Sequence, residues 1–376
     1  MTINKNEPVS ERMALSVMNR YTPEQVQWHY EHGLVLQSIW AVGKAYKKTG
    51  YGAWVKTMYD TKIMSDGSIA TYRAGEFNLD QINPGKLLFD LYDETGDKKY
   101  RAAIELLRAQ LKNHPRTKSG GFWHKKIYPW QMWLDGVYMA QPFCARCALE
   151  FGGPEDFADI ARHFTLIEEH ARDKTTGLLY HAWDESGEQR WANPETGCSP
   201  HFWGRALSWY CMALTDTLDF IPVEYQAERE SLLAIANRLL APLMNYQDRE
   251  SGLWYQVLDQ AGQEKNYLEA SASSMFVYFF LKMLRKGYCQ TAKERIQKAA
   301  LRGYEGLLAR MIREDKNGEL HLEGICSVAG LGGNPYRDGS YAYYVSEPVK
   351  ADDFKGVGPF ILASLEMEHG KAQCFV

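Results

Sequence analysis

The sequence predicts an all-α protein: an (α/α)6 barrel in which six helical hairpins form two concentric rings. Three observations predict this fold. Several long stretches place apolar residues at the helical period, which is typical of helices with one buried face. Other stretches are apolar nearly all round, which is typical of fully buried helices. Connectors that begin with glycine and continue with aromatic or apolar residues recur between the two kinds, too far apart for common solenoid repeats.

The stretches with a single apolar stripe are expected to form the outer ring. In residues 97–114 the apolar positions at helical spacing are Tyr100, Ala103, Ile104, Leu107 and Leu111. The same period recurs in residues 157–167, 232–243 and about 292–312. Charged residues separate the apolar positions, so each stretch predicts a helix that packs on one side and faces water on the other.

The stretches without a polar face are expected to form the inner ring. They are residues 25–47, 84–92, 133–149, 203–214, 270–284 and 354–367. Asn83 followed by Pro84 is typical of a helix start, with asparagine at the N-cap and proline in the first turn. Pro142 is expected to kink or restart the helix in which it lies.

The connectors are expected to form short β-hairpins that join each outer helix to the next inner one. They contain residues 121–124, 177–181, 252–256 and 318–322, and turn-forming residues follow at 185–188 and 260–263. No Pro/Gly/Ser-rich linker interrupts the chain. Residues 1–376 are therefore expected to form one domain, with residues 1–20 as an N-terminal lead-in.

Composition excludes several classes of protein. The chain has 376 residues, is 45% hydrophobic and 24% charged, and carries a net charge of −4. These values are globular and argue against a nucleic-acid partner. Seven scattered cysteines favour a reducing compartment, no secretory signal is visible, and the apolar run 275–281 is too short for a membrane. We expect a soluble cytoplasmic protein. An aromatic content of 13% suits either a carbohydrate cleft or a wide helical core.

Polar residues that do not suit an apolar core cluster where the predicted buried helices begin. They are Asp80, Asp135, His201, Arg205 and Glu269, together with Trp203. If the inner helices run in one direction, these positions share one mouth of the barrel. Helix N-termini favour an anion there, and the guanidinium of Arg205 is suited to holding a carboxylate at two points.

Each candidate also has a purely structural interpretation. Asp135 precedes a glycine and could be an N-cap, whereas Asn83 makes a capping role less suitable for Asp80. His124 and His181 could be hydrogen-bonded core histidines, although they occupy matching places in two connectors. Arg205 could pair with an internal carboxylate. We find neither the spacing of a metal site nor a serine nucleophile elbow, so no metal or cofactor is expected.

Four segments together resemble glycoside hydrolase family 105, the unsaturated rhamnogalacturonyl hydrolases, which are related to the unsaturated glucuronyl hydrolases of family 88. They are WLDGVYMAQPF (133–143), NLDQINPGKLLF (78–89), GLLYHAWD (177–184) and HFWGRALSW (201–209). The resemblance extends over about residues 25–367. It implies an (α/α)6 barrel that acts on pectin oligosaccharides bearing a C4=C5 unsaturated uronic acid at the non-reducing end. Such enzymes add water to the double bond and release the unsaturated sugar as a 4-deoxy-5-keto-uronate.

The resemblance also implies roles for individual residues. Asp135 matches the general acid/base and Asp80 matches the second essential carboxylate. The residues expected to bind the unsaturated sugar are His124, His181, Trp203 and Arg205, with His201 and Trp133 as further candidates.

Three alternatives remain at this stage. They are a hydrolase of unsaturated glycosaminoglycan disaccharides, a sugar epimerase on the same barrel, and a non-catalytic sugar-binding protein. The presence of both carboxylates disfavours the last. The expected partner is an unsaturated pectin-derived oligosaccharide such as a disaccharide, and the sequence does not define an oligomeric state.

Overall fold

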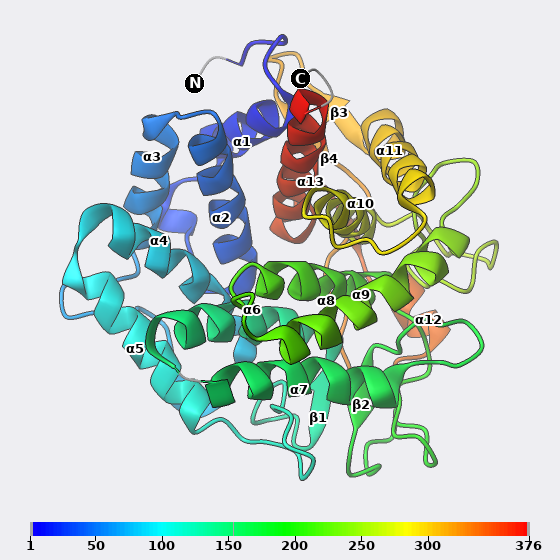
Figure 1. Ribbon diagram of the computed structural model, residues 1–376. Helices are drawn as coiled ribbons and strands as arrows, with labels where there is room; N and C mark the ends of the chain where they lie inside the picture. Colours follow the sequence, from blue (N-terminus) through cyan, green and yellow to red (C-terminus); the bar gives the residue numbers. More distant parts are fainter. Residues whose placement is uncertain (1–2, 153, 374–376) are drawn as a thin grey trace.

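Six helices form the inner ring of the barrel in the computed structural model, which describes residues 3–152 and 154–373. They are α2 (Tyr30–Ala45), α4 (Lys86–Thr95), α6 (Leu134–Phe151), α8 (Gly204–Leu218), α10 (Ala270–Arg285) and α13 (Phe354–Gln373). Each packs on the next in this order, and α13 packs on α2, so the ring closes (Figure 1). The predicted (α/α)6 barrel is confirmed.

Six further helices cover the inner ring from outside. They are α1 (Val9–Arg20), α3 (Thr49–Asp60), α5 (Lys98–Lys112), α7 (Pro154–Ala171), α9 (Gln226–Asn245) and α11 (Lys293–Arg310). Helix α3 packs on α2, and α5, α7, α9 and α11 pack in turn on α4, α6, α8 and α10. Figure 1 shows α1 beside α13.

The N-terminal segment differs from the expectation. Residues 1–20 were expected to be a lead-in, but residues 9–20 form α1 and bury Met13, Ala14 and Val17 against the barrel. Without this helix, the outer side of α13 would have no partner from the outer ring. The sequence pattern does not indicate helix α3 either, because Gly50 and Gly52 lower the helix propensity of its first turn.

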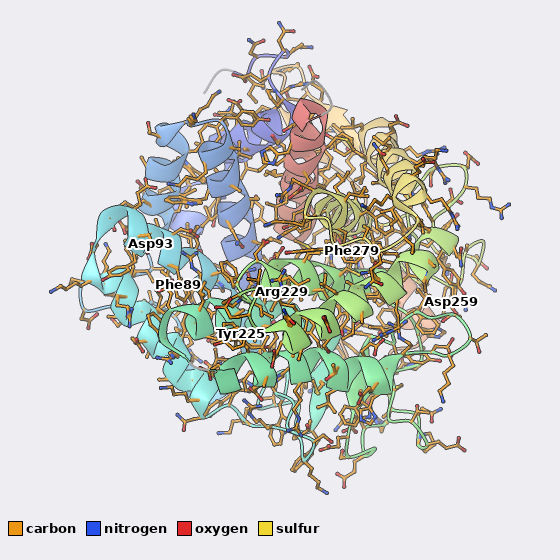
Figure 2. The ribbon with its side chains drawn as sticks, viewed as in Figure 1. Phe89, Asp93, Tyr225, Arg229, Asp259 and Phe279 are labelled. Atoms are coloured by element: carbon orange, nitrogen blue, oxygen red, sulfur yellow. The ribbon has the colours of Figure 1, made fainter. Side chains whose placement is uncertain are left out.

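The inner helices begin and end close to the predicted positions. Every residue of α8 is buried, and Pro142 lies inside a continuous α6. The start of α4 is a correction: residues 83–85 form a 3-10 turn, and Asn83 donates a hydrogen bond to the Tyr138 carbonyl (3.4 Å) instead of capping a helix. Figure 2 labels both Phe89 and Asp93 on α4; Phe89 is fully buried, whereas the side chain of Asp93 is mostly exposed.

Two of the connectors share one turn, which explains the recurring glycine. Asp173 accepts hydrogen bonds from the backbone N–H (2.6 Å) and the hydroxyl (2.7 Å) of Thr176. Asp248 accepts the same two bonds from Ser251, at 2.7 and 2.6 Å. The glycine after each of them has a φ of 74° and 75°, a left-handed conformation that strongly favours glycine.

Short antiparallel strand pairs complete the connectors. They are β1 (Gln131–Trp133) with β2 (Ala182–Asp184), β3 (Ile312–Glu314) with β4 (Leu320–Leu322), and β5 (Ile325–Cys326) with β6 (Val349–Lys350). Strands β3 and β4 form a local hairpin, as the sequence predicts, and the connector with residues 252–256 also folds back locally, where Tyr255 pairs antiparallel with Leu268. Strands β1 and β2 come from successive connectors, which the sequence did not indicate.

The remaining short elements lie in the connecting segments. They are helix α12 (Tyr341–Ser346) and 3-10 turns at Pro23–Gln25, Ala74–Glu76, Leu79–Gln81 and Asn83–Gly85. In the part of the chain that the structure describes, no helix is both long and apolar enough to cross a membrane.

We propose that the closed ring is one cooperative domain, because removing any hairpin exposes the apolar faces of its neighbours. Limited proteolysis is expected to cut connectors such as residues 185–193 well before any helix. The measurement is a time course of fragments by mass spectrometry. Isolation of a stable, folded half cut near residue 220 would contradict a single closed ring.

Candidate active site

Asp135 lies in the first turn of α6, at the mouth where the inner helices begin. Trp133 occupies the N-cap position of this helix. Oδ2 of Asp135 is buried and accepts no hydrogen bond from any residue that the structure describes. Its near neighbour is Nε2 of His181, at 3.3 Å. Asp135 therefore does not cap the helix, and its carboxyl group is free to act on a ligand.

His181 is held in place by a chain of hydrogen bonds from three other segments. The ring is fully buried, and its Nδ1 lies 2.7 Å from the hydroxyl of Tyr344. Nε2 of Gln256 donates to the backbone carbonyl of Tyr344 (3.1 Å), and Oε1 of Gln256 accepts a hydrogen bond from the indole N–H of Trp203 (3.0 Å). Because Nδ1 is engaged, Nε2 of His181 is the ring atom directed at Asp135.

Asp80 lies in a different electrostatic environment. Nζ of Lys125 is 2.5 Å from its Oδ2, Nε2 of His124 is 3.6 Å from its Oδ1, and His29 is 3.9 Å away. Burial alone would raise the pKa of Asp80, but the attraction of Lys125 and the two histidines outweighs burial and holds this pKa well below its usual range. Asp80 is therefore a carboxylate at neutral pH.

Aromatic rings line the space between the two carboxyl groups. Trp133 stacks on His124, with ring centroids 4.5 Å apart and an interplanar angle of 9°, and also on Tyr128, at 4.8 Å. Its edge meets His181 at 5.3 Å. Burial lowers the pKa of His124 to about 4, although Asp80 opposes this shift, so the ring is neutral at pH 7.

Gly136, which follows Asp135, allows His124 to lie this close to α6. A Cβ at this position would lie 2.9 Å from Nδ1 of His124 and 3.3 Å from Cδ1 of Leu79. The first distance is too short for a stable contact. The glycine of the WLDG segment is therefore required by packing at the site itself.

Gly136→Ala is expected to lower kcat/KM by about tenfold or more, because the methyl group displaces His124 and the segment that carries Asp80. The loss of stability should be small, since alanine favours the helix by about 1 kcal/mol and offsets part of the clash. Steady-state kinetics and thermal unfolding measure the two effects. The control is Gly50→Ala in the first turn of α3, where a Cβ meets no atom within 4 Å. Equal activities of the two variants would contradict this account.

The sequence left two roles open for Arg205, binding a ligand carboxylate and pairing with an internal carboxylate, and the structure is compatible with both. Its side chain is buried in the first turn of α8, where Nη1 donates to the Cys326 carbonyl (2.6 Å) and lies 4.0 Å from Oε1 of Glu269. Its Nη2 is also buried but has no partner among the described residues. One edge of the guanidinium is thus anchored internally, and the other can still bind an anion.

Glu269 and His201 are less directly connected to the two carboxyl groups. Glu269 caps α10 by accepting a hydrogen bond from the Ala272 N–H (2.6 Å), which is a structural role. The ring of His201 lies 6.3 Å from that of Tyr341. Its backbone carbonyl, and not its ring, accepts a hydrogen bond from the N–H of His181 (3.4 Å). The structure therefore does not bring the His201 side chain to Asp135.

Sequence reasoning missed three residues that build this site: Lys125, Gln256 and Tyr344. Lys125 follows His124 directly, and a cation next to a buried carboxylate could have been sought there. Gln256 ends a connector that matches the one ending in His181, so its place in the repeat was a usable signal. Tyr344 lies in α12, within a segment of little periodicity, and nothing in the sequence indicated that it would meet His181.

These side chains form two carboxyl groups with different chemistry at one mouth of an (α/α)6 barrel. Asp80 is paired with Lys125, whereas Asp135 has only the imidazole of His181 beside its Oδ2, which accepts no hydrogen bond from the described residues. Aromatic rings pack beside both carboxyl groups, a composition that is typical of sites for carbohydrates. Fold and site together define a sugar-cleaving enzyme of the helical-barrel class. The chain belongs to Glycosyl Hydrolase Family 88, whose profile matches residues 9–371.

Individual relatives are similar over much of the chain. A solved structure of a glycoside hydrolase from family 105 of C. acetobutylicum ATCC 824 is 47% identical, with a TM-score of 0.93 over 96% of this chain and 100% of that one. "Protein Atu3128" of Agrobacterium fabrum is 41% identical over 61% of this chain and 97% of its own length. "Unsaturated rhamnogalacturonyl hydrolase YesR" of Bacillus subtilis is 28% identical over 70% of this chain and 74% of its own length. The protein is a glycoside hydrolase, and the resemblance seen in its sequence is confirmed.

Proposed function

We propose that the protein hydrates the C4=C5 double bond of an unsaturated galacturonyl residue at the non-reducing end of rhamnogalacturonan oligosaccharides. The observation that carries this proposal is the contrast between a carboxyl group beside His181 and a second one held ionised by Lys125. The similarity to the rhamnogalacturonyl hydrolase of B. subtilis supports the choice of a galacturonyl over a glucuronyl substrate.

The reaction begins with proton transfer to carbon. The carboxyl group of Asp135 protonates C4 of the enol ether, which leaves a positive charge shared between C5 and the ring oxygen. Water adds to C5 and gives its proton to the Asp135 carboxylate, so one residue acts first as acid and then as base. His181 orients this carboxyl group through its contact with Oδ2.

Release of the next sugar follows from the product of hydration. The C5 hemiketal opens by breaking its bond to the ring oxygen, which gives a ketone at C5 and a hydroxyl group on C1. C1 is then a hemiacetal that still carries the next sugar, and its collapse to an aldehyde expels that sugar as an alcohol. The glycosidic bond is therefore lost without direct attack on C1.

Asp80 is suited to a different part of the reaction. Its low pKa, set by Lys125 and the neighbouring histidines against the effect of burial, means that it cannot supply a proton at neutral pH. A fixed carboxylate can instead stabilise the positive charge that develops at C5 and accept hydrogen bonds from sugar hydroxyls. Because Asp80 stays ionised, we infer that Asp135 is the carboxyl group that transfers the proton.

The uronate carboxylate is expected to bind the free edge of Arg205. Arg205→Lys keeps the charge but loses the Nη2 group that has no partner among the described residues, so KM should rise by about tenfold or more, with a smaller change in kcat. Initial rates and thermal unfolding, measured together, check this. A KM equal to the wild-type value with a large loss of thermal stability would restrict Arg205 to its internal contacts with Cys326 and Glu269.

The test of the function compares two unsaturated disaccharides made by lyases. One is the unsaturated rhamnogalacturonan disaccharide, and the other is an unsaturated glucuronyl disaccharide from a glycosaminoglycan. Loss of the ultraviolet absorbance of the conjugated double bond reports hydration of each. We expect kcat/KM to be higher for the first. A higher value for the second would replace the galacturonyl proposal by the glucuronyl one, and no absorbance loss with either would contradict both.

The proposed place of this reaction is the cytoplasm, with small oligosaccharides as substrates. The cysteines that the structure describes are free thiols, and all but Cys144 are buried, which suits a reducing compartment. Cell fractionation with an activity assay on the disaccharide tests this placement.

A further inference from the structure

The other end of the barrel contains a cavity of about 790 Å³ that the proposed reaction does not use. The second halves of the inner helices α2, α6, α8, α10 and α13 contribute to its walls, together with the start of α4. Its volume is in the range of sites that bind small molecules. Charged side chains from several of these helices face the cavity, so its occupant should be polar.

Most of the cations that line this cavity have an acidic partner. The pairs are Arg146 with Asp90 (3.0 Å), Lys282 with Asp216 (2.7 Å), Arg285 with Glu366 (2.5 Å), and Lys44 with Glu94. Tyr278 also donates to Asp216 (2.7 Å), so that carboxylate is already engaged. The acidic groups in these pairs are therefore committed to the cations beside them.

Lys86 differs from these residues. It is 6% exposed, and its Nζ has no hydrogen-bond partner among the described residues. Nζ lies 4.0 Å from the ring centroid of Tyr138, a contact that compensates only in part for the lost hydration of an ammonium group. Burial outweighs the opposing attraction of Asp216 and, together with the repulsion of Lys282, lowers the pKa of Lys86 to about 7. Nζ of Lys86 therefore lacks an anionic partner among the described residues.

Gln37 supplies a second group without a partner. Its Oε1 is buried, accepts no hydrogen bond from the described residues, and lines the same cavity from α2. A carbonyl oxygen requires a donor such as a hydroxyl group. Lys86 requires an acceptor with negative charge. A ligand that satisfies both carries a carboxylate and at least one hydroxyl group.

An aromatic layer separates this cavity from the catalytic mouth. Tyr138 stacks on Trp209, with centroids 4.7 Å apart, and Trp209 meets Tyr30 edge to face at 6.0 Å. Tyr30 lies on the catalytic side, because the charges of Asp80 and Asp135 act on it. A molecule beside Lys86 would therefore not touch the two carboxyl groups.

We propose that this cavity is a second binding site for a small hydroxylated monocarboxylate of the sugar-acid class. Lys86 binds the carboxylate of the ligand, and Oε1 of Gln37 accepts a hydrogen bond from one of its hydroxyl groups. The site is independent of the proposed reaction, because it uses none of the residues that carry out that reaction.

Isothermal titration calorimetry with D-galacturonate tests this proposal. Wild-type protein is expected to bind one equivalent of D-galacturonate at this site. Lys86→Met should raise the Kd of that equivalent by at least about tenfold, the scale of a charge-assisted hydrogen bond. D-galactose, which has no carboxylate, should not bind there. The matched control is Lys44→Met, which removes an exposed lysine of the same cavity that is already paired with Glu94 and should leave this binding unchanged. Inorganic phosphate, added as a competitor, shows whether any small anion suffices.

The outcomes separate this site from the catalytic one. Both lysine variants should retain wild-type kcat and KM on the unsaturated disaccharide, so a failed reaction and an unoccupied second site are distinct results. If Lys86→Met does not fold, Gln37→Leu should weaken the same equivalent. The proposal would be overturned if Lys86→Met and Gln37→Leu both bound D-galacturonate as the wild type does. It would also be overturned if no bound equivalent of D-galacturonate depended on Lys86.

Discussion

Asp135→Asn is expected to lower kcat by about 100-fold or more while the protein remains folded. Asparagine keeps the shape of the side chain and a carbonyl oxygen near His181, but it has no transferable proton. Protonation of C4 then loses its acid, and water loses its base. The measurement is the rate of absorbance loss on the unsaturated disaccharide, combined with thermal unfolding.

The control for this substitution is Asp97→Asn. Asp97 is an N-cap that accepts a hydrogen bond from the N–H of Lys99 (3.1 Å), and asparagine caps helices as well as aspartate does. Asp97→Asn should therefore change neither activity nor stability appreciably. Near-normal turnover of Asp135→Asn would reduce Asp135 to a structural residue of α6.

Asp80→Asn is expected to have the second large effect, on both activity and stability. In this variant Lys125 loses its anionic partner. This loss should lower the free energy of unfolding by about 3 kcal/mol at neutral pH. Turnover should also fall by about 100-fold, because the carboxylate opposite the developing positive charge is lost. Chemical unfolding and steady-state kinetics measure these two losses.

The pH dependence gives this prediction a definite sign. The pKa of Asp80 in the folded protein lies below its ordinary value, so its ion pair stabilises the fold above the unfolded-state pKa, about 4. That contribution is lost as the pH falls toward the folded-state pKa. The difference in stability between wild type and Asp80→Asn should therefore be constant above about pH 5 and shrink below about pH 4.

Asp60→Asn is the control for Asp80→Asn. Asp60 is also paired with lysine, Lys56 at 2.6 Å and Lys99 at 2.9 Å, but it lies on the outer helix α3. Its substitution should leave turnover unchanged. If Asp80→Asn retained full activity and the same stability profile with pH as wild type, the ion pair with Lys125 would have no role in the site.

Much of the fold could be predicted from hydrophobic periodicity. The apolar stripe of α5 and the completely buried α8 distinguish the two rings, because an outer helix buries one face whereas α8 is buried on every side. The outer helix α3 was less predictable, since its two early glycines weaken a pattern that tertiary packing then stabilises. The helix α1 is explained only by the closed ring, which needs an outer partner for α13.

The residues of the site also fall into those that could be predicted from the sequence and those that could not. Asp135 and Asp80 could be predicted as candidates, because carboxylates at the starts of apolar helices do not suit a core. The ion pair with Lys125 had only the adjacency of Lys125 to His124 as a signal, and the contact of Tyr344 with His181 had none, because both contacts join segments far apart in the chain. Side-chain contacts of this kind depend on how the loops pack together at the mouth, and no local period records that arrangement.

Isotope incorporation from labelled water tests the central claim of hydration most directly. In heavy water the released keto-uronate should carry deuterium at C4, because solvent-derived hydrogen on Asp135 is transferred to that carbon. In ¹⁸O-labelled water the new oxygen should first be found at C5, in samples quenched early because the ketone exchanges its oxygen. Mass spectrometry and NMR of the product locate both labels. Oxygen label arriving initially at C1, with no deuterium at C4, would contradict hydration and indicate ordinary attack on the anomeric carbon.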